Sequence, residues 1–539
     1  MQKLSILMAQ INPKVGAIKN NAKKIIDIIK QHQEEQDLII FPELVLSGYP
    51  PEDLLLRNDF FLQIDDALNQ IANNVKNCHV IIGHPHLKQQ QRFNAASVFY
   101  QGQNIQTYHK QHLPNYGIFD EVRYFIKGEP KPCIITVNGY KMGLCICEDL
   151  WQAGPVEQVK EAGAQALICI NASPFDYNKY QTRTDLLKAH AQKGLTIIYV
   201  NQISGQDELL FDGQSLVMDE KGEIYARAPA FREILQTVQL SDKGIHGEIT
   251  PLQDHYELIY NALVFGTKDY VLKNNFPGVL LGLSGGIDSA LTLAIAVDAL
   301  GTENVHTLMM PSRYTADIST YDAMKLLDNL NVSHSTLSIE PAFNSLLSTL
   351  APEFTGYSPD ITEENMQARI RAILLMAMSN KTGKMVLTTS NKSETAVGYT
   401  TLYGDMAGGF AVLKDVLKTQ VYELAKYVNR KEEIIPERIL TRPPSAELAA
   451  NQTDQDTLPE YTVLDELIHG FMEMNLSAED LIQQGHSTEL VKRVIRLIVR
   501  NEYKRRQAPP GIRISPRAFG KDWRYPITSG AFQGNESFF

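Results

Sequence analysis

The chain has 539 residues, 44% of them hydrophobic and 21% charged, which is too long for one hydrophobic core and predicts two or three domains. The net charge of −11 argues against a general nucleic-acid-binding protein. No apolar run approaches the roughly 18 residues of a membrane helix, the N-terminus is typical of a strand and not of a signal peptide, and the five cysteines favour a cytoplasmic protein with free thiols.

Short β-type runs alternate with helical periodicity in the first half. So many strands with few helices between them predict an α-β-β-α sandwich, with two facing sheets and helices outside. The pattern weakens from about 230 to 251, so we expect a linker there and place the domains at 1–245 and 246–539. The expected strands are 4–10, 38–41, 80–83, 97–100, 134–137, 142–146, 166–170, 196–200 and 215–218, and the expected helices are 20–33, 60–76, 156–162 and 182–193.

Glu43, Lys110 and Cys147 each stand at the end of a β-type run. Taken alone, a free cysteine is more often a buried structural residue, and a lone glutamate or lysine is more often a solvated surface charge. Taken together, in this order and in their local sequences, the three resemble the Glu–Lys–Cys triad of the nitrilase (carbon–nitrogen hydrolase) superfamily.

The nitrilase resemblance implies a role for each of the three residues. Glu43 is the expected general base, Lys110 stabilises the oxyanion, and Cys147 is the nucleophile that forms a thioester. We expect the ammonium group of Lys110 to lower the pKa of the neighbouring thiol and so to favour the thiolate. The same ammonium group meets the charge that develops on the tetrahedral oxygen.

The same resemblance assigns a glutamine pocket to Tyr116, Glu121, Ser173 and Lys179. Bound glutamine is a zwitterion, so its pocket needs an anionic partner for the α-amine and a cationic partner for the α-carboxylate. Glu121 and Lys179 have the required charges. An alternative role for Glu121 is to orient the catalytic lysine.

The second half begins with an expected helix and then repeats strand and helix regularly. This alternation predicts a doubly wound parallel sheet of Rossmann-like type, which binds ligands at the carboxyl ends of its strands. The expected strands are 280–283, 305–310, 334–338 and 384–389, and the expected helices are 256–273, 290–300, 319–330 and 364–381.

The motif Ser-Gly-Gly-Ile-Asp-Ser, residues 284–289, lies between the first of these strands and the next helix. Adjacent glycines and a helix start present N–H groups to a phosphate, and Asp288 is a natural ligand for Mg²⁺. A bare Ser-Gly-Gly run is usually only a turn, and the spacing differs from both common nucleotide-binding glycine motifs. The full motif resembles the pyrophosphate loop of ATP-pyrophosphatases, which split ATP into AMP and pyrophosphate.

The fusion of the two halves resembles the glutamine-dependent NAD⁺ synthetases over essentially the whole chain. The resemblance implies that ammonia from glutamine amidates the adenylated carboxylate of deamido-NAD⁺, which gives NAD⁺, AMP, pyrophosphate and glutamate in the last step of NAD⁺ biosynthesis. It implies Mg²⁺ as the cofactor and glutamine, ATP and deamido-NAD⁺ as small-molecule partners. It also implies a homo-oligomer with no nucleic-acid or membrane partner.

Site residues of the second half follow from this resemblance. Arg369 and Arg371, on the helix that bears Asn365, suit either a ligand site or a solvated face. The expected ATP-binding residues are Gly282, Leu283, Ser284, Gly285, Gly286, Ile287, Asp288, Ser289, Thr389, Lys418 and Ser445; the expected deamido-NAD⁺-binding residues are Asn365, Glu394 and Lys504; and the expected metal ligands are Asp288 and Glu394.

Two other readings of the sequence stay open. The same architecture would suit an amidotransferase that acts on another carboxylate, although relatives with pyrophosphate loops usually carry different glutaminase domains. Alternatively, the second domain is a nucleotide sensor that regulates an amidase. Intact Asp288 and Ser289 argue against a nucleotide site without activity.

Overall fold

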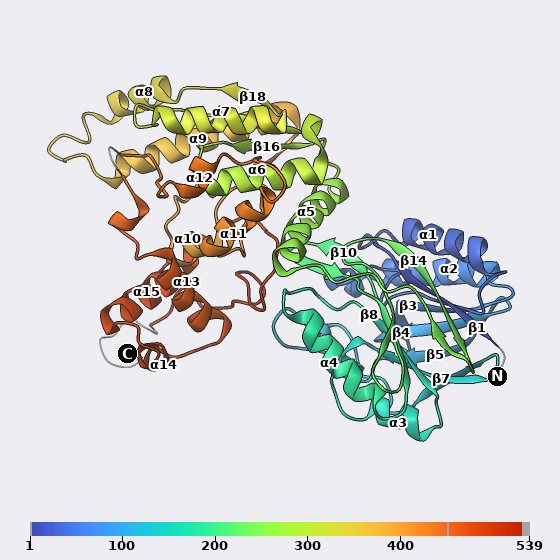
Figure 1. Cartoon of the computed structure of the whole chain (residues 1–539). Coiled ribbons are helices and arrows are strands. Elements are labelled where there is room, and N and C mark those ends of the chain that lie inside the picture. Colours follow the sequence, from blue (N-terminus) through green and yellow to red (C-terminus); the bar gives the residue numbers. More distant parts are fainter. Residues whose placement is uncertain (1–2, 450–451, 531–539) are drawn as a thin grey trace. The chain divides into compact units, whose positions relative to one another are not determined.

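The computed structural model describes residues 3–449 and 452–530, and it divides into two compact units, Met1–Asp254 and His255–Phe539 (Figure 1). Within those described ranges, we find no helix with both the length and the apolar character needed to cross a membrane.

The first unit contains two large sheets and a β-ribbon of two strands. One sheet has seven strands in the order β15-β14-β1-β2-β3-β4-β5, and the other has six in the order β13-β12-β9-β8-β7-β6. The strands are β1 (Leu4–Gln10), β2 (Leu38–Ile40), β3 (His79–Lys88), β4 (Gln91–Tyr100), β5 (Gln103–His109), β6 (Cys133–Val137), β7 (Tyr140–Ile146), β8 (Ala166–Asn171), β9 (Thr196–Asn201), β10 (Ile203–Gln206), β11 (Leu209–Asp212), β12 (Leu216–Met218), β13 (Ile224–Arg227), β14 (Ile234–Ser241) and β15 (Gly244–His246).

The two sheets pack face to face, as the alternation along β1 illustrates. Ile6 and Met8 share a buried core with Ile146 and Ile168 of the opposite sheet, whereas Leu7 points the other way, into a core formed with the helices. The helices are α1 (Ile18–His32) and α2 (Asn58–Asn74) over the larger sheet, and α3 (Pro155–Glu161) and α4 (Lys179–Ala191) over the smaller one. The predicted α-β-β-α sandwich is confirmed.

The segment from about 230 to 251 was expected to be a linker, and this expectation is wrong. It contains β14, which pairs antiparallel with β1 in the interior of the larger sheet, and β15, which pairs with β14. The alternation of apolar and polar residues that marks a strand is hard to see in β14, because the polar Gln236 takes a buried position along with Val238 and Leu240. The boundary placed at 245/246 falls within β15.

The second unit is built on a fully parallel sheet in the order β18-β17-β16-β19-β20. The chain leaves β16 in one direction along the sheet and later returns to its other side through β19. This reversal is the point where doubly wound sheets bind ligands, and it confirms the predicted fold. The strands are β16 (Val279–Gly282), β17 (Val305–Met309), β18 (Ser333–Thr336), β19 (Met385–Thr388) and β20 (Phe410–Ala411).

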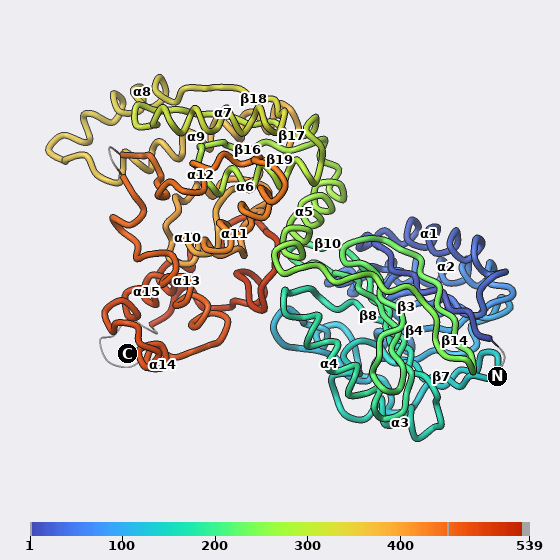
Figure 2. The backbone as a smooth tube through the Cα atoms, viewed as in Figure 1, coloured from blue at the N-terminus to red at the C-terminus, as the bar shows by residue number. Residues whose placement is uncertain are grey.

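Helices cover both faces of this sheet, and β16 lies between α9 and α6 (Figure 2). On one face, Leu280 and Val386 form a core with Phe343 of α8 and Ile370 of α9. The helices are α5 (His255–Lys273), α6 (Ile287–Leu300), α7 (Asp317–Leu330), α8 (Glu340–Leu350), α9 (Ile361–Thr382), α10 (Lys392–Val397), α11 (Lys418–Val428), α12 (Glu437–Thr441), α13 (Tyr461–Ile468), α14 (Ala478–Gln483), α15 (Thr488–Arg500) and α16 (Glu502–Arg505).

Beyond the sheet, the C-terminal helices form a core of their own. Leu464 of α13 and Val494 of α15 pack with Trp523 near the C-terminus and with Val397 of α10. This core places α10, which follows strand β19, between the sheet and the C-terminal helices.

Candidate functional site

The structure brings Glu43 and Lys110 together inside the first unit. Glu43 follows β2 and Lys110 follows β5, and their side chains are 0% and 1% exposed. The Lys110 Nζ atom donates to Glu43 Oε1 at 2.7 Å and to Glu121 Oε1 at 2.9 Å. One buried ammonium group therefore lies between two buried carboxylates. Burial and the neighbouring Glu43 raise the pKa of the Glu121 carboxyl to about 7, although Lys110 acts in the opposite direction.

Cys147 begins a short 3-10 turn directly after β7 and is buried. Its φ of 43° is in the left-handed region that non-glycine residues rarely adopt, as is common where a side chain is directed at a functional site. Burial and the charge of Glu43 raise the pKa of the Cys147 thiol well above its usual value, while Lys110 acts in the opposite direction. The expectation that Lys110 makes this thiol acidic is wrong in its net effect, because burial outweighs the ammonium group.

A residue that the sequence did not single out, Asp149, connects the lysine and cysteine segments. Its Oδ1 accepts the backbone N–H groups of Gln111 and His112, just after Lys110, at 3.0 and 2.9 Å. Its Oδ2 accepts the N–H of Ile146, just before Cys147, at 3.1 Å. The only signal in the sequence is an acidic residue two positions after the candidate nucleophile.

Two further hydrogen bonds and a closely packed glycine hold Glu43 in place. Asn94 Nδ2 donates to Glu43 Oε1 at 2.7 Å, and the backbone N–H of Ala172 donates to Oε2 at 2.8 Å. On β3, Gly83 lies so close that a Cβ there would be 2.4 Å from the carbonyl oxygen of Pro42. Only glycine fits beneath the turn that bears Glu43.

The four candidates for the glutamine pocket have different surroundings. Glu121 accepts the phenol of Tyr49 at 2.9 Å in addition to Lys110, so its contacts are those of a residue that orients the lysine. Tyr116 is half-exposed and donates to Glu148 Oε2 at 3.0 Å. Ser173 is buried, and the Lys179 ammonium lies 4.4 Å from the centre of the Trp151 ring.

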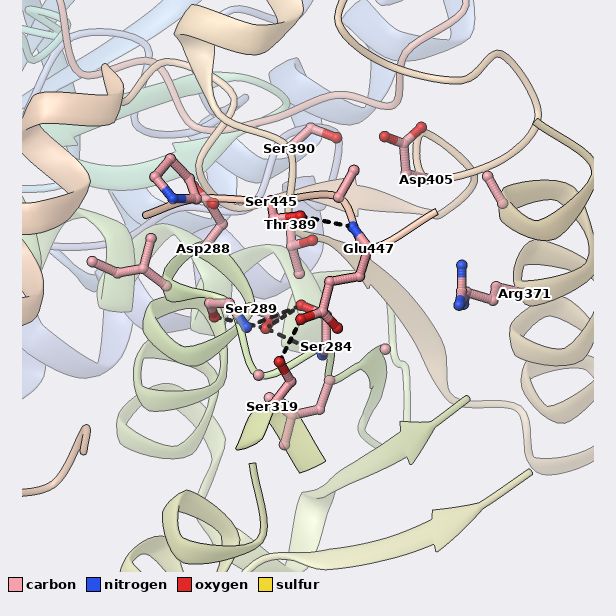
Figure 3. Close-up of a pocket in the computed structure, with 18 of the residues that line it drawn as sticks. Ser284, Asp288, Ser289, Ser319, Arg371, Thr389, Ser390, Asp405, Ser445 and Glu447 are labelled. Carbon is pink, nitrogen blue, oxygen red and sulfur yellow. Dashed lines mark hydrogen bonds between the residues drawn. The ribbon is translucent and has the colours of Figure 1, made fainter. Parts of the chain in front are cut away.

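In the second unit, a cavity of about 320 Å³ opens at the carboxyl ends of β16, β17 and β19 (Figure 3). All the expected ATP-binding residues line this cavity: Gly282, Leu283, Ser284, Gly285, Gly286, Ile287, Asp288, Ser289, Thr389, Lys418 and Ser445. Glu394 also lines it. The residues that were expected to bind ATP therefore lie around a single cavity, and their role in ATP binding stays a prediction.

Asn365 and Lys504, which were expected to bind deamido-NAD⁺, are not among the residues that line the cavity. Asn365 Oδ1 accepts the hydroxyl of Thr401, which lines the cavity, at 2.9 Å. Lys504 Nζ donates to the carbonyl oxygens of Gly398 and Thr400, both at 2.8 Å.

The glycine-rich loop has the geometry that phosphate binding needs. Gly285 has a φ of 81°, and a Cβ there would lie 2.4 Å from the carbonyl oxygen of Ser319. Ser289 Oγ donates to the carbonyl oxygen of Gly286 at 2.9 Å, which closes the loop at the start of α6. The first turn of this helix, with its positive dipole end, lines the cavity. Within the loop, the N–H groups of Ser284 and Gly286 donate to the hydroxyls of Ser289 and Ser284.

Lys418 joins two carboxylates at the edge of the cavity. Its Nζ atom lies 2.5 Å from Asp288 Oδ2 and 2.9 Å from Glu394 Oε1. Burial alone would lower the pKa of Lys418, but Asp288 and Glu394 raise it above its ordinary value. Among the described residues, no group of three or more His, Cys, Asp and Glu side chains could hold a metal ion. The two carboxylates nevertheless fit Mg²⁺, which commonly uses one or two carboxylates together with substrate phosphates.

Arg371 and Glu447 also line the cavity. Arg371 donates to the carbonyl oxygen of Met310 at 3.1 Å, so the interpretation as a solvated face is wrong for this residue. Arg369 is exposed and does not line the cavity, in agreement with that interpretation. Glu447 accepts the hydroxyl of Ser319 at 2.6 Å, and it was missed because an acidic residue in a loop has no pattern in the sequence.

Comparisons with known proteins agree with the families predicted for the two halves of the chain. A model of the carbon-nitrogen hydrolase family matches residues 6–245, and a model of the NAD synthase family matches residues 259–508. The glutamine-dependent NAD(+) synthetase of Acinetobacter baylyi is 45% identical, with 98% of this chain and 99% of that protein covered. Its counterpart in Xanthomonas campestris pv. campestris is 46% identical, with 98% of each covered. The solved structure of the Acinetobacter baumannii enzyme with ADP has 44% identity and a TM-score of 0.80 over 98% of this chain and 99% of that one. The chain therefore belongs to the family of glutamine-dependent NAD⁺ synthetases.

Proposed function

We propose that this chain uses ammonia from glutamine to convert deamido-NAD⁺ into NAD⁺ at the expense of ATP. The observation that carries the proposal is the presence, in one chain, of a buried Glu–Lys pair at a cysteine and a pocket walled by a pyrophosphate-type loop. One site releases ammonia, and the other prepares the carboxylate that ammonia attacks.

In the amidase reaction, Glu43 takes the proton of Cys147 as its sulfur attacks the carboxamide carbon of glutamine. The raised pKa of the thiol supports this role, because a protonated nucleophile needs a base during attack. The C–N bond breaks, ammonia leaves with the proton, and water then hydrolyses the thioester to glutamate. Lys110 stabilises the oxyanion in both steps.

Glu121 is better suited to orienting Lys110 than to binding the α-amine of glutamine. Its Oε1 is shared by Lys110 and Tyr49, and its side chain is buried. We assign glutamine binding to the more peripheral Tyr116, to Ser173 and to Lys179, whose ammonium can meet an α-carboxylate.

In the synthetase reaction, a carboxylate oxygen of deamido-NAD⁺ attacks the α-phosphorus of ATP, and pyrophosphate leaves. Ammonia then attacks the resulting acyl carbon, and AMP leaves with the electron pair of the broken C–O bond. The N–H groups of the loop 284–289, with Thr389, Lys418 and Ser445, bind the nucleotide. Asn365, Glu394 and Lys504 bind deamido-NAD⁺.

Asp288 and Glu394 would hold Mg²⁺. When bound, this ion supplies positive charge that neutralises phosphate oxygens. Lys418, which contacts both carboxylates, would meet the phosphates of the nucleotide.

We also expect a cytoplasmic homo-oligomer without nucleic-acid or membrane partners. Light scattering coupled to gel filtration measures the subunit number directly, and a monomeric mass at micromolar concentration would contradict the oligomer.

Product analysis tests the function. Deamido-NAD⁺, ATP, Mg²⁺ and glutamine should yield NAD⁺, AMP, pyrophosphate and glutamate in equal amounts. AMP formation with another carboxylate but not with deamido-NAD⁺ would support an amidotransferase with a different acceptor. Intact ATP with every carboxylate, together with glutaminase activity that responds to nucleotide, would support the sensor.

A further inference from the structure

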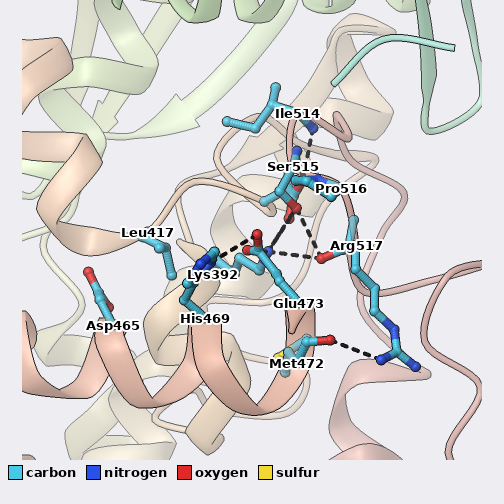
Figure 4. Close-up of polar contacts among 12 residues, drawn as sticks. Lys392, Leu417, Asp465, His469, Met472, Glu473, Ile514, Ser515, Pro516 and Arg517 are labelled. Atoms are coloured by element: carbon cyan, nitrogen blue, oxygen red, sulfur yellow. Dashed lines mark hydrogen bonds and ion pairs between the residues drawn. The ribbon is translucent and has the colours of Figure 1, made fainter. Parts of the chain in front are cut away.

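Lys392 is a buried lysine at the start of α10, and it is not among the residues that line the cavity. Its Nζ atom lies 2.7 Å from Glu473 Oε1 and 2.8 Å from Asp415 Oδ1, and both carboxylates are buried. The same ammonium donates to Ser515 Oγ at 2.9 Å and to the carbonyl oxygen of Arg517 at 3.0 Å (Figure 4).

These partners come from three separate parts of the chain. Glu473 ends the π-turn after α13, Asp415 precedes α11, and Ser515 belongs to the C-terminal segment. Asp415 Oδ2 also accepts the N–H groups of Ile514 and Ser515 at 2.8 and 2.7 Å. Lys392 and Asp415 thus attach the C-terminal segment to the first residue of α10.

The chain that leads into this segment holds the other end of α10. Arg505 Nη1 donates to the carbonyl oxygen of Ala396 at 2.7 Å, and Asn501 Nδ2 donates to that of Val397 at 2.9 Å. The last carbonyls of a helix have no partner within the helix, so these bonds from outside determine where the helix ends. Residues 501–517 therefore hold α10 at both ends.

Helix α10 and its N-cap carry polar groups of the nucleotide pocket. Asn391 Nδ2 donates to Asp288 Oδ1 at 2.9 Å, and Asn391 Oδ1 accepts the N–H of Glu394 at 2.9 Å. Glu394 in turn accepts from Lys418. A shift of α10 would move Asn391 and Glu394 relative to Asp288, which lies on α6.

We propose that Lys392 is a positioning residue of the synthetase site. It fixes α10 against the C-terminal segment, so that Asn391 and Glu394 meet Asp288 with the spacing that Mg²⁺-bound ATP requires. This inference rests on the proposed function, in which Asp288 and Glu394 face the metal ion of ATP.

Substitution of Lys392 should have a large effect because its single ammonium group faces two buried carboxylates. Removal of the ammonium leaves Asp415 and Glu473 uncompensated, which is strongly destabilising in buried pairs. Ser515→Ala is the milder change, because it removes one hydroxyl of the C-terminal segment and leaves every charge in place. Lys392→Arg keeps the charge with different donor geometry.

The test measures binding of ATP with Mg²⁺ by calorimetry, and ammonia-dependent NAD⁺ synthesis, in the full chain. Lys392→Met should weaken ATP binding and raise the KM for ATP about tenfold or more. Lys392→Arg and Ser515→Ala should do so by smaller factors. Glutaminase activity without ATP should not change. The matched control is Lys426→Met, the same substitution at an exposed lysine, which pairs with Glu423 on α11.

Unchanged ATP affinity in folded Lys392→Met would overturn the proposal. If this variant fails to fold, Ser515→Ala decides, and wild-type ATP affinity in that variant would overturn the proposal as well. An equal loss in Lys426→Met would also contradict it, because loss of a lysine charge outside the cluster would then have the same effect. Failure of the proposed function has a different signature, since the wild type itself would then form no NAD⁺.

Discussion

In the amidase site the charged groups are closed in, whereas in the synthetase site they border an open cavity. Glu43 and Lys110 are 0% and 1% exposed, while the side chains of Asp288 and Glu394 are 18% and 17% exposed. The buried Lys110 is paired with both Glu43 and Glu121, so these three charged groups compensate part of one another's desolvation. The two pocket carboxylates share one lysine, Lys418, whose own side chain is buried.

This difference follows from what each site binds. The amidase must raise the reactivity of one sulfur atom, and a rigid, dry surrounding strengthens every charge that acts on it. The synthetase must admit two large anionic nucleotides, so it offers N–H groups, hydroxyls and a cavity of about 320 Å³. Changes in the first site should therefore alter rates, and changes in the second should alter nucleotide binding as well.

The largest effect is expected for Cys147→Ala. Glutamine-dependent NAD⁺ synthesis should fall by at least about 10⁴-fold, because no other group can form the thioester. Synthesis from added ammonium chloride should remain near the wild-type rate. Cys145→Ala is the matched control, because Cys145 is buried on the opposite face of β7. Loss of synthesis from both donors would show that the two sites are not separable.

Asp288→Asn should lower AMP formation with either nitrogen donor by about a hundredfold or more, because the carboxylate charge that we propose holds Mg²⁺ beside the phosphates is lost. Basal glutaminase activity should remain. Asp298→Asn tests the same change near the far end of α6, where Asp298 accepts the phenol of Tyr260 at 2.7 Å. A wild-type rate of AMP release in Asp288→Asn would exclude the assigned metal role.

Glu121→Gln separates the two roles of Glu121. If this residue orients Lys110, glutaminase kcat should fall about tenfold or more while the KM for glutamine stays within about twofold. Tyr116→Phe, which removes the bond to Glu148, should instead act mainly on KM. A rise in KM at constant kcat for Glu121→Gln would return this residue to the substrate pocket.

The smallest effect concerns acid stability of the first unit. Burial lowers the pKa of His84 from 6.5 to about 3, and its Nε2 atom lies 2.8 Å from Ser97 Oγ. His84 stays neutral in the folded state while the unfolded chain takes up a proton below pH 6.5. Its contribution is therefore fully present above that pH and is lost as the pH falls, by about 2 kcal/mol between pH 6.5 and 5.

Denaturant unfolding of the wild type and of His84→Gln, at pH 7.5 and at pH 5, measures this contribution. The variant keeps a polar partner for Ser97 and should lose less stability between the two conditions. An identical loss in both proteins would mean that other groups govern acid stability.

Local patterns in the sequence were sufficient for the class of both folds and for the glycine-rich loop, whereas Thr389, Lys418 and Ser445 followed from the family resemblance. The motif 284–289 lies in one stretch of chain, so strand, turn and helix are all visible around it. The strand β14 was missed because its position depends on pairing with β1, at the other end of the unit. The role of Glu121 stayed open because Tyr49, its second partner, comes from a distant turn.

Residue types and their order determined the chemistry: a Glu–Lys–Cys set in one half and a phosphate loop in the other. Only the tertiary structure decided that the Cys147 thiol is less acidic than usual, because burial depends on both sheets closing over it. It also decided that Asp149 joins the lysine and cysteine segments, and that Lys392 ties α10 to the C-terminal segment. Such contacts join residues far apart in the chain, and no local pattern of residues encodes them.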